Sequence, residues 1–280
     1  MVRHLLGFVV LGGLSMILWM VWTGPNGPLE LGVASRSRDA ESGRGAAPTT
    51  APPPDALRVL FVGNSHTQYN DMPGMIAKLA AADGVSRPLY AEVEARGGAT
   101  LEEHLSSGRV ADRLRGGRWE YVVLQEQQQR PSFTFNPKQV ERQFMGPAQT
   151  LDVLIRAAGA GTLLFMTWAR RKGDPGNVTG DTYEQMQARL ESGYTTLARR
   201  IDVPVAPVGL AWQRAARTRP SLSLWAADGN HASKAGSYLA ACVLYEALYE
   251  RSSVGNPYLG GLAEGEAQYL QRSAHEAVDR

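Results

Sequence analysis

The sequence LRVLFVG occupies residues Leu57 to Gly63. It is a short run of mainly apolar side chains that ends at a glycine, which is typical of a strand buried on both faces of a parallel sheet. Similar short apolar runs recur along the chain, and longer segments with helical spacing of apolar residues lie between them. The pattern predicts strands that alternate with helices from Leu57 onward.

The predicted elements fall into two sets. Strands are expected at residues 57–62, 89–94, 121–124, 162–166 and 203–208. Helices are expected at residues 72–82, 100–114, 139–158, 183–200 and 233–250, and the second of them starts with a capping-box pattern at Thr100 and Glu103. Alternation of this kind implies parallel pairing through right-handed crossovers. We therefore expect an α/β fold, a three-layer α/β/α sandwich with a five-stranded parallel sheet.

Residues 1–56 differ in composition from the rest of the chain. Leu5 to Trp22 contains no charged residue, and at about 1.5 Å per residue it nearly spans a bilayer as a helix. Arg3 precedes this run, which by the positive-inside rule places the following residues outside the cytoplasm. The sequence predicts a signal anchor over residues 1–23, a Pro-, Ala- and Ser-rich linker over residues 24–56, and a folded domain over residues 57–280. The domain is expected outside the cytoplasm and attached to the membrane, or secreted if the N-terminal segment is cleaved.

Composition excludes several classes of protein. The 280 residues are 44% apolar and 20% charged, as in a soluble globular protein. Lys and Arg number 29 and Asp and Glu number 27, for a formal charge of +2, so a nucleic-acid partner is not expected. The single cysteine, Cys242, excludes an internal disulfide. No metal-ligand spacing or dinucleotide fingerprint is present in the sequence, so neither a metal nor a cofactor is expected.

Residues with useful chemistry follow three of the predicted strands. Ser65 comes directly after the first strand, Gly98 lies in the turn after the second, and Gln125 and Gln127 follow the third. The carboxyl ends of parallel strands lie along one edge of a sheet, where ligands bind. Taken singly, each residue is also explained as a helix cap, a turn glycine or a turn-capping amide.

A fourth feature lies near the end of the chain. Asp228 precedes His231 by three residues, just before the last predicted helix. An Asp at this spacing can accept from one imidazole nitrogen and leave the other for a serine hydroxyl, although a solvated loop is an alternative interpretation. Other histidines lack such a carboxylate at usable spacing: His66 adjoins Ser65, and His104 is expected on a solvent-exposed face.

Together these blocks resemble those of the SGNH, or GDSL-like, hydrolases. They are Gly63-Asn64-Ser65, Gly98, Gln127 and Asp228-x-x-His231. The similarity in order and spacing covers roughly Leu57 to Leu248. This chain departs from the family pattern at two positions. Asn64 replaces the Asp of the family's Gly-Asp-Ser, and Gln127 stands at the position of the family's Asn. The third block of this chain is Leu124-Gln125-Glu126-Gln127, and branches of the family with a block of this type look most similar.

The resemblance implies a flavodoxin-like SGNH-hydrolase fold and a serine hydrolase that needs no cofactor. Ser65 would be the nucleophile, His231 its base, and Asp228 the group that orients the imidazole. The N–H groups of Ser65 and Gly98, with the side chain of Gln127, would form the oxyanion hole, and Gln125 is the alternative side-chain donor.

Two residues after the fourth predicted strand are candidates for substrate binding. Trp168 could stack on a sugar ring and Arg170 could bind an anionic group, while core packing and solvation are the alternatives. We expect an esterase that removes an acyl group, such as acetyl, from a small-molecule or carbohydrate ester. Acyl transfer to a sugar hydroxyl, or a carbohydrate-binding module that has lost catalytic activity, are the competing hypotheses.

Overall fold

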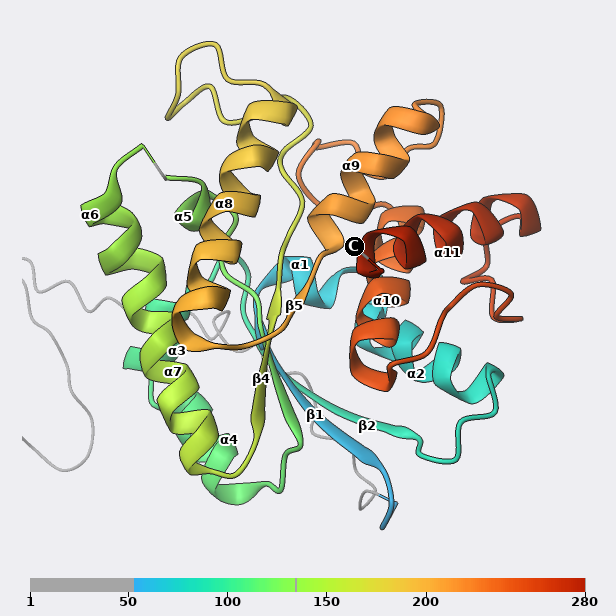
Figure 1. Ribbon diagram of the computed structural model, residues 1–280, viewed down its shortest axis with the longest axis horizontal. Coiled ribbons are helices and arrows are strands. Elements are labelled where there is room, and N and C mark those ends of the chain that lie inside the picture. Colours follow the sequence, from blue (N-terminus) through green and yellow to red (C-terminus); the bar gives the residue numbers. More distant parts are fainter. Residues whose placement is uncertain (1–52, 134, 280) are drawn as a thin grey trace, which may run out of the picture. The chain divides into compact units, whose positions relative to one another are not determined.

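The computed structural model describes residues 53–133 and 135–279, and these residues fold around a five-stranded parallel sheet (Figure 1). The strands are β1 (Leu57–Gly63), β2 (Leu89–Ala95), β3 (Tyr121–Leu124), β4 (Gly161–Phe165) and β5 (Val205–Ala206). Their order across the sheet is β2-β1-β3-β4-β5, and every neighbouring pair is parallel. The predicted sheet is confirmed. The chain forms β2 on one side of β1 and then crosses over to form β3 on the other side. The carboxyl end of β1 therefore lies at the switch point where α/β proteins bind ligands.

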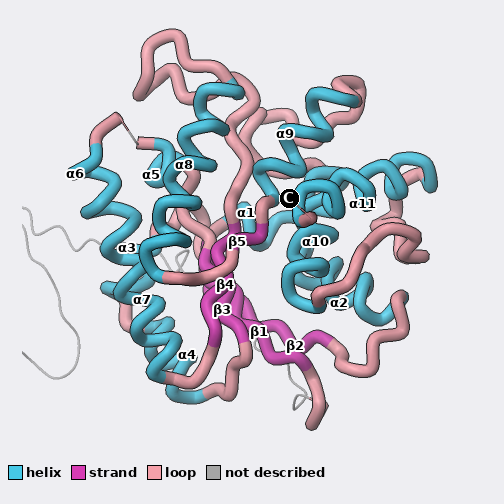
Figure 2. The backbone as a smooth tube through the Cα atoms, in the orientation of Figure 1, coloured by secondary structure: helices cyan, strands magenta, loops and turns pink. Residues whose placement is uncertain are grey.

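Helices cover both faces of the sheet (Figure 1 and Figure 2). The helical segments are α1 (Ser65–Gln68), η1 (Tyr69–Asp71), α2 (Met72–Ala82), α3 (Leu101–Ser106), α4 (Arg109–Gly116), α5 (Gln129–Ser132), α6 (Pro137–Val140), η2 (Glu141–Met145), α7 (Gly146–Ala157), α8 (Tyr183–Ile201), α9 (Val208–Thr218), α10 (Lys234–Tyr249) and α11 (Glu264–Val278). In Figure 1, α3, α4, α7 and α8 lie on one side of the sheet and α2, α10 and α11 on the other. The predicted three-layer α/β/α sandwich is confirmed.

The central strands are buried because helices pack on both of their faces. In β1, Leu60 and Phe61 have no exposed surface, and in β3 the same is true of Val122. This explains why these strands are continuous apolar runs instead of alternating ones.

One predicted helix is two helices in the structure. Residues 100–114 were expected to form a single helix, but α3 ends at Ser106 and α4 starts at Arg109. Gly108 between them has a φ of 72°, a left-handed conformation that a glycine adopts without strain and that ends a helix. The capping box at the start of α3 is confirmed, because the Thr100 side chain accepts from the Glu103 N–H while the Glu103 side chain accepts from the Thr100 N–H.

The end of the domain differs more from the expectation. The strand predicted at residues 203–208 is reduced to Val205–Ala206, since Pro204 and Pro207 flank it and have no N–H for a sheet ladder. Helices α9 and α11 were not predicted. The sequence of α11 is mostly polar, but Ala267 and Leu270 on one face are fully buried, so a narrow apolar stripe is enough where another helix covers it.

The predicted anchor and nearly all of the predicted linker lie outside the described residues. Within residues 53–133 and 135–279, no helix has both the length and the apolar character needed to cross a bilayer.

Candidate active site

Ser65 lies at the first position of α1, directly beyond the carboxyl end of β1. Asn64 caps this short helix, because its Oδ1 accepts from the His66 N–H at 3.0 Å. The turn is tight: a Cβ at Gly63 would come within 2.5 Å of the side chains of Gln125 and Thr67. A glycine is therefore required before the Asn-Ser turn, and the turn presents the Ser65 hydroxyl at the edge of the sheet.

His231 meets this serine from the other end of the domain. Ser65 Oγ and His231 Nε2 lie 2.9 Å apart, although the two residues are separated by 166 positions in the sequence. Both side chains are only partly buried, so a substrate can reach them.

Asp228 holds the His231 turn and the His231 ring with its two carboxylate oxygens. Oδ1 accepts from the N–H groups of Asn230 and His231 at 2.9 and 3.0 Å. Oδ2 lies 2.5 Å from His231 Nδ1. The hydrogen bond from His231, with that from the Asn230 N–H, lowers the pKa of Asp228 to about 2. An ionised carboxylate only accepts, so Nδ1 of His231 carries the proton and Nε2 is free to accept from the Ser65 hydroxyl.

The two residues predicted to complete an oxyanion hole lie in the neighbouring turns. Gly98 follows β2 with a φ of 68°, and its turn is tied to the serine turn because Asn64 Nδ2 donates to the Ala99 carbonyl at 3.0 Å. Gln127 follows β3. Within residues 53–133 and 135–279, no hydrogen bond joins either residue to Ser65, so their part in the reaction stays a prediction.

Gln125 has a different environment from Gln127. Its side chain is fully buried, and its Oε1 accepts from the Asn64 N–H and from the Thr67 hydroxyl, both at 2.9 Å. Its Nε2 donates to the Glu126 carbonyl at 2.7 Å. Gln125 therefore supports the turn that carries Ser65 through its buried side-chain oxygen, while its amide N–H donates to the backbone of its own loop.

Glu126 links the turns after β2 and β3. Its carboxyl group is fully buried, accepts from the Leu101 N–H at 3.1 Å and accepts from the Gln127 N–H at 2.5 Å. Burial raises the pKa of Glu126 to about 8. Because Leu101 starts α3, the side chain joins the first turn of that helix to the loop that carries Gln127.

The amide of Gln127 is oriented by a chain of hydrogen bonds that ends at a carboxylate. Asp174 can only accept when ionised, so Gln129 must direct its Nε2 toward it, at 2.8 Å. The Oε1 of Gln129 then accepts from Gln127 Nε2 at 2.9 Å, and the Gln129 N–H donates to Gln127 Oε1 at 3.0 Å. This arrangement uses one N–H of the Gln127 amide, and within the part of the chain that the structure describes the other N–H has no hydrogen-bond partner.

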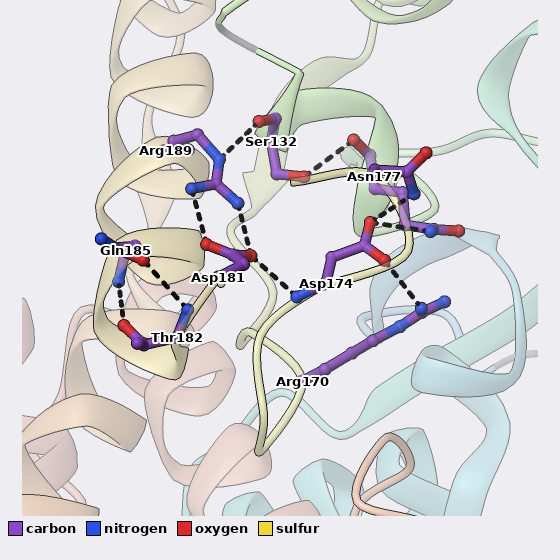
Figure 3. Close-up of polar contacts among 9 residues, drawn as sticks. Ser132, Arg170, Asp174, Asn177, Asp181, Thr182, Gln185 and Arg189 are labelled. Carbon is purple, nitrogen blue, oxygen red and sulfur yellow. Dashed lines mark hydrogen bonds and ion pairs between the residues drawn. The ribbon is translucent and has the colours of Figure 1, made fainter. Parts of the chain in front are cut away.

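Asp174 belongs to a polar network in the loop after β4 (Figure 3). It accepts from Arg170 Nη1 at 3.3 Å and from Asn177 Nδ2 at 2.7 Å, and its N–H donates to Asp181 Oδ2 at 2.7 Å. Asp181 is in turn paired with Arg189 of α8 at 2.7 Å. The network positions the half-buried Arg170 side chain.

Trp168 does not have the exposure that substrate stacking requires. The prediction that its indole binds a sugar ring is wrong, since the side chain has no exposed surface. Its ring stacks on Trp212 at a centroid distance of 4.2 Å, and its Nε1 donates to the Asn230 carbonyl at 2.9 Å. Trp168 therefore supports the loop that carries His231.

Comparison with solved structures identifies the family. One of them, a protein from Slackia heliotrinireducens described as an SGNH hydrolase, is 31% identical to this chain, with 68% of this chain and 98% of that protein covered and a TM-score of 0.57. The chain belongs to the SGNH hydrolase family. The expected family, the expected fold and the expected hydrolase of SGNH type are thus confirmed.

Two further structures resemble this SGNH hydrolase in fold. A DUF4886 family protein from Bacteroides uniformis is 20% identical with a TM-score of 0.61, covering 80% of this chain and 95% of its own. An acetylxylan esterase from Geobacillus stearothermophilus is 13% identical with a TM-score of 0.54, covering 69% and 94%. The chain matches no family model and no curated protein.

Sequence reasoning missed several residues of the SGNH site. His104 was expected on a solvent-exposed face, but it is buried and its Nε2–H donates to the Gly63 carbonyl at 2.7 Å. Tyr69 stacks on the His231 ring at 4.6 Å, and the structural roles of His66 and Asp174 were not foreseen either. His66, Tyr69 and His104 lie in helical segments of only three to six residues, and Asp174 lies in a loop. Segments this short carry no clear periodic signal, so no sequence pattern marks these residues.

His66 is the second imidazole near the site of this SGNH hydrolase. Its ring centroid lies 5.6 Å from that of His231. Burial, and then the nearby His231, lower the pKa of His66 to about 4. At neutral pH this ring is uncharged, so it does not oppose a positive charge on His231.

Proposed function

We propose that this chain is a serine esterase that hydrolyses an acyl ester through Ser65, His231 and Asp228. The observation that carries the proposal is the chain of two short contacts, 2.9 Å from Ser65 Oγ to His231 Nε2 and 2.5 Å from His231 Nδ1 to Asp228 Oδ2. A nucleophile, a base within hydrogen-bond reach, and a carboxylate that orients the base are the parts that acyl transfer to a serine needs.

In the proposed reaction His231 Nε2 takes the hydroxyl proton as Ser65 Oγ attacks the ester carbonyl. The proton then passes from His231 to the leaving alcohol, and the acyl group remains on Ser65. Water, deprotonated by His231, attacks the acyl-enzyme, and His231 Nε2 then returns that proton to Ser65 Oγ as the acid leaves. Asp228 stays ionised throughout and stabilises the imidazolium in both steps.

The oxyanion would be bound by three donors. Ser65 is the first residue of α1, where a helix provides no backbone acceptor for its N–H, the N–H of Gly98 belongs to the adjacent turn, and Gln127 has one amide N–H not used by Gln129. Donors of this kind contribute most when they are held in place before the reaction, and losing one costs about 10²- to 10³-fold in kcat.

The substrate we propose is an acetyl ester, on a carbohydrate or another small alcohol. A structure similar in fold is an acetylxylan esterase, and Arg170, held by Asp174, lies in the loop after β4 as a candidate partner for a polar or anionic substituent. Location outside the cytoplasm is also a proposal, which rests on the apolar sequence from Leu5 to Trp22.

The test is turnover of p-nitrophenyl acetate by the wild-type chain and two variants. Ser65→Ala should lower kcat/KM by at least about 10⁴-fold, and Asp228→Asn should lower it less, because the nucleophile and the oxyanion donors remain. Ser252→Ala, which changes an exposed serine far along the chain, is the matched control and should retain full activity. Turnover by Ser65→Ala close to that of the wild type would exclude the serine mechanism. An inactive wild type would favour a binding module, and acylation of an added sugar in preference to water would favour a transferase.

A further inference from the structure

Tyr69 presents the face of its ring to the ring of His231. The two centroids lie 4.6 Å apart and the planes differ by 16°. The Tyr69 side chain is 41% exposed, so it is not held there by burial in the core. Tyr69 comes directly after α1 (Ser65–Gln68), so one short segment carries both the nucleophile and the ring that faces the base.

Hydrogen bonds join the backbone at Tyr69 and Asn70 to the segment that follows His231. Asn70 Nδ2 donates to the Ala232 carbonyl at 3.2 Å and to Ser237 Oγ at 2.9 Å. The Ser237 hydroxyl donates to the Tyr69 carbonyl at 3.3 Å. These three bonds join the chain after α1 to the residue beside His231 and to α10.

The same segment has an uncommon backbone conformation. Asn70 and Asp71 are consecutive non-glycine residues with φ of 56° and 55°. Left-handed residues other than glycine are uncommon, and they persist where the surroundings hold them, often at functional sites. Here the two residues separate Tyr69 from α2, which begins at Met72.

The charge on His231 is the property that such a ring affects. In the proposed reaction the imidazole becomes an imidazolium only while Ser65 attacks or is released. An aromatic face attracts a cation more strongly than a neutral ring, so a stacked tyrosine stabilises the protonated state over the resting state. The groups around His231 are then Asp228 on Nδ1, Ser65 on Nε2, the Tyr69 ring, and His66, whose centroid lies 5.6 Å away.

We propose that Tyr69 is a positioning residue of the active site, which fixes the plane of the His231 ring and stabilises its protonated form through the aromatic face. The inference rests on the proposed function, since it assumes that His231 is the base for Ser65. It requires an aromatic ring at position 69 but not the hydroxyl.

The experiment compares Tyr69→Phe and Tyr69→Leu in p-nitrophenyl acetate turnover. Cation–π contributions of about 0.5 to 2 kcal/mol correspond to roughly 2- to 30-fold in rate. We expect Tyr69→Leu to lower kcat by roughly 10-fold with little change in KM, and Tyr69→Phe to keep kcat within about twofold of wild type. Tyr249→Leu is the control: it removes a tyrosine of α10 whose hydroxyl donates to the Arg87 carbonyl just before β2, and it should leave kcat unchanged.

A spectroscopic readout separates ring stacking from a general loss of fold. In the folded wild type the His231 ring protons should show a ring-current shift from Tyr69, which Tyr69→Phe keeps and Tyr69→Leu loses while the rest of the NMR spectrum stays folded. An active wild type with unchanged kcat in Tyr69→Leu, or an equal loss in Tyr69→Phe, would overturn the inference alone. A rise in KM without a fall in kcat would also overturn it, because Tyr69 would then contact substrate. Equal turnover by wild type and Ser65→Ala would instead overturn the proposed function, and this inference with it.

Discussion

Gln125 and Gln127 lie two residues apart, and the structure separates their roles. The Gln125 amide is completely enclosed and accepts from the backbone of Asn64 and the hydroxyl of Thr67. The Gln127 amide is partly exposed, and among the described residues only one of its N–H groups donates a hydrogen bond. One glutamine is therefore a support for the serine turn, and the other is the better candidate for an oxyanion donor.

Gln125→Ala should destabilise the protein. It leaves the Asn64 N–H and the Thr67 hydroxyl without an acceptor in a buried site, and it leaves a cavity, which together cost about 2 to 4 kcal/mol in the free energy of unfolding. Chemical denaturation of the purified variant measures this loss. A free energy of unfolding equal to that of wild type would contradict the contacts described for Gln125.

Gln127→Ala should instead lower kcat by roughly 10²-fold with little change in KM, because an oxyanion bond forms mainly in the transition state. Its melting temperature should stay close to that of wild type. Steady-state kinetics on p-nitrophenyl acetate test this. If kcat is unchanged, the N–H groups of Ser65 and Gly98 make the oxyanion hole without Gln127.

At the scale of elements, Glu126 joins the end of β3 to the start of α3. Its carboxyl group accepts from the N–H of Leu101, the first residue of α3, and from the N–H of Gln127, the next residue of its own loop. It therefore joins the turns that follow β2 and β3. Its pKa is about 8 in the folded protein against an ordinary value of 4.5. The folded state therefore holds a proton that the unfolded chain releases between these pH values. The proton contributes its full stabilisation of the folded state below about pH 4.5, and this stabilisation is lost as the pH rises through about 8.

Glu126→Gln should show this as a pH-dependent difference in stability. The variant cannot ionise, so its free energy of unfolding should be near that of wild type at pH 5 and higher by about 4 kcal/mol at pH 9. Urea denaturation at both pH values measures it. Glu102→Gln, at an exposed position of α3, is the control and should show no such difference. A Glu126→Gln effect of equal size at pH 5 and pH 9 would mean that the carboxyl group does not titrate in this range.

At the scale of the whole molecule, segments from both ends of the described chain complete one core. Asn256 Nδ2 donates to the Leu79 carbonyl of α2 at 2.9 Å, and Tyr245 of α10 donates to Asp83 Oδ2, just after α2, at 2.5 Å. The helices that close one face of the sheet therefore depend on residues near the start and near the end of the domain.

A variant that begins at Asp55 keeps every strand and helix of this core. We expect it to be soluble without detergent, to unfold in a single cooperative transition, and to retain esterase activity. A variant that begins at Asn64 lacks β1, the strand between β2 and β3, and should aggregate. Aggregation of the first variant, under conditions where the full-length chain in detergent is well behaved, would contradict the predicted division of the chain at residue 56.

Local sequence patterns were enough to predict most of the sheet and to select Ser65, Asp228 and His231 as candidates for the site. The strand at residues 121–124 was predicted with its observed bounds, because a buried strand must be apolar on both faces and its composition shows this directly. Ser65, Asp228 and His231 stood out because each lies in a turn beside a predicted element, where a side chain with catalytic chemistry is conspicuous. The resemblance to the SGNH hydrolases rested on the same turns.

Only the tertiary structure decided which side chains meet in space. Composition could not show that Trp168 is enclosed beneath the His231 loop, that His104 donates to the backbone of Gly63, or that Tyr69 faces His231. Each of these contacts joins residues that local patterns treat independently. Periodicity shows whether an element has a buried face. The distance between Ser65 and His231, which are 166 positions apart in the sequence, depends instead on how the crossovers bring the carboxyl ends of β1 and its neighbours to one edge of the sheet. That placement is a property of the assembled sheet, and no single segment of the sequence contains it.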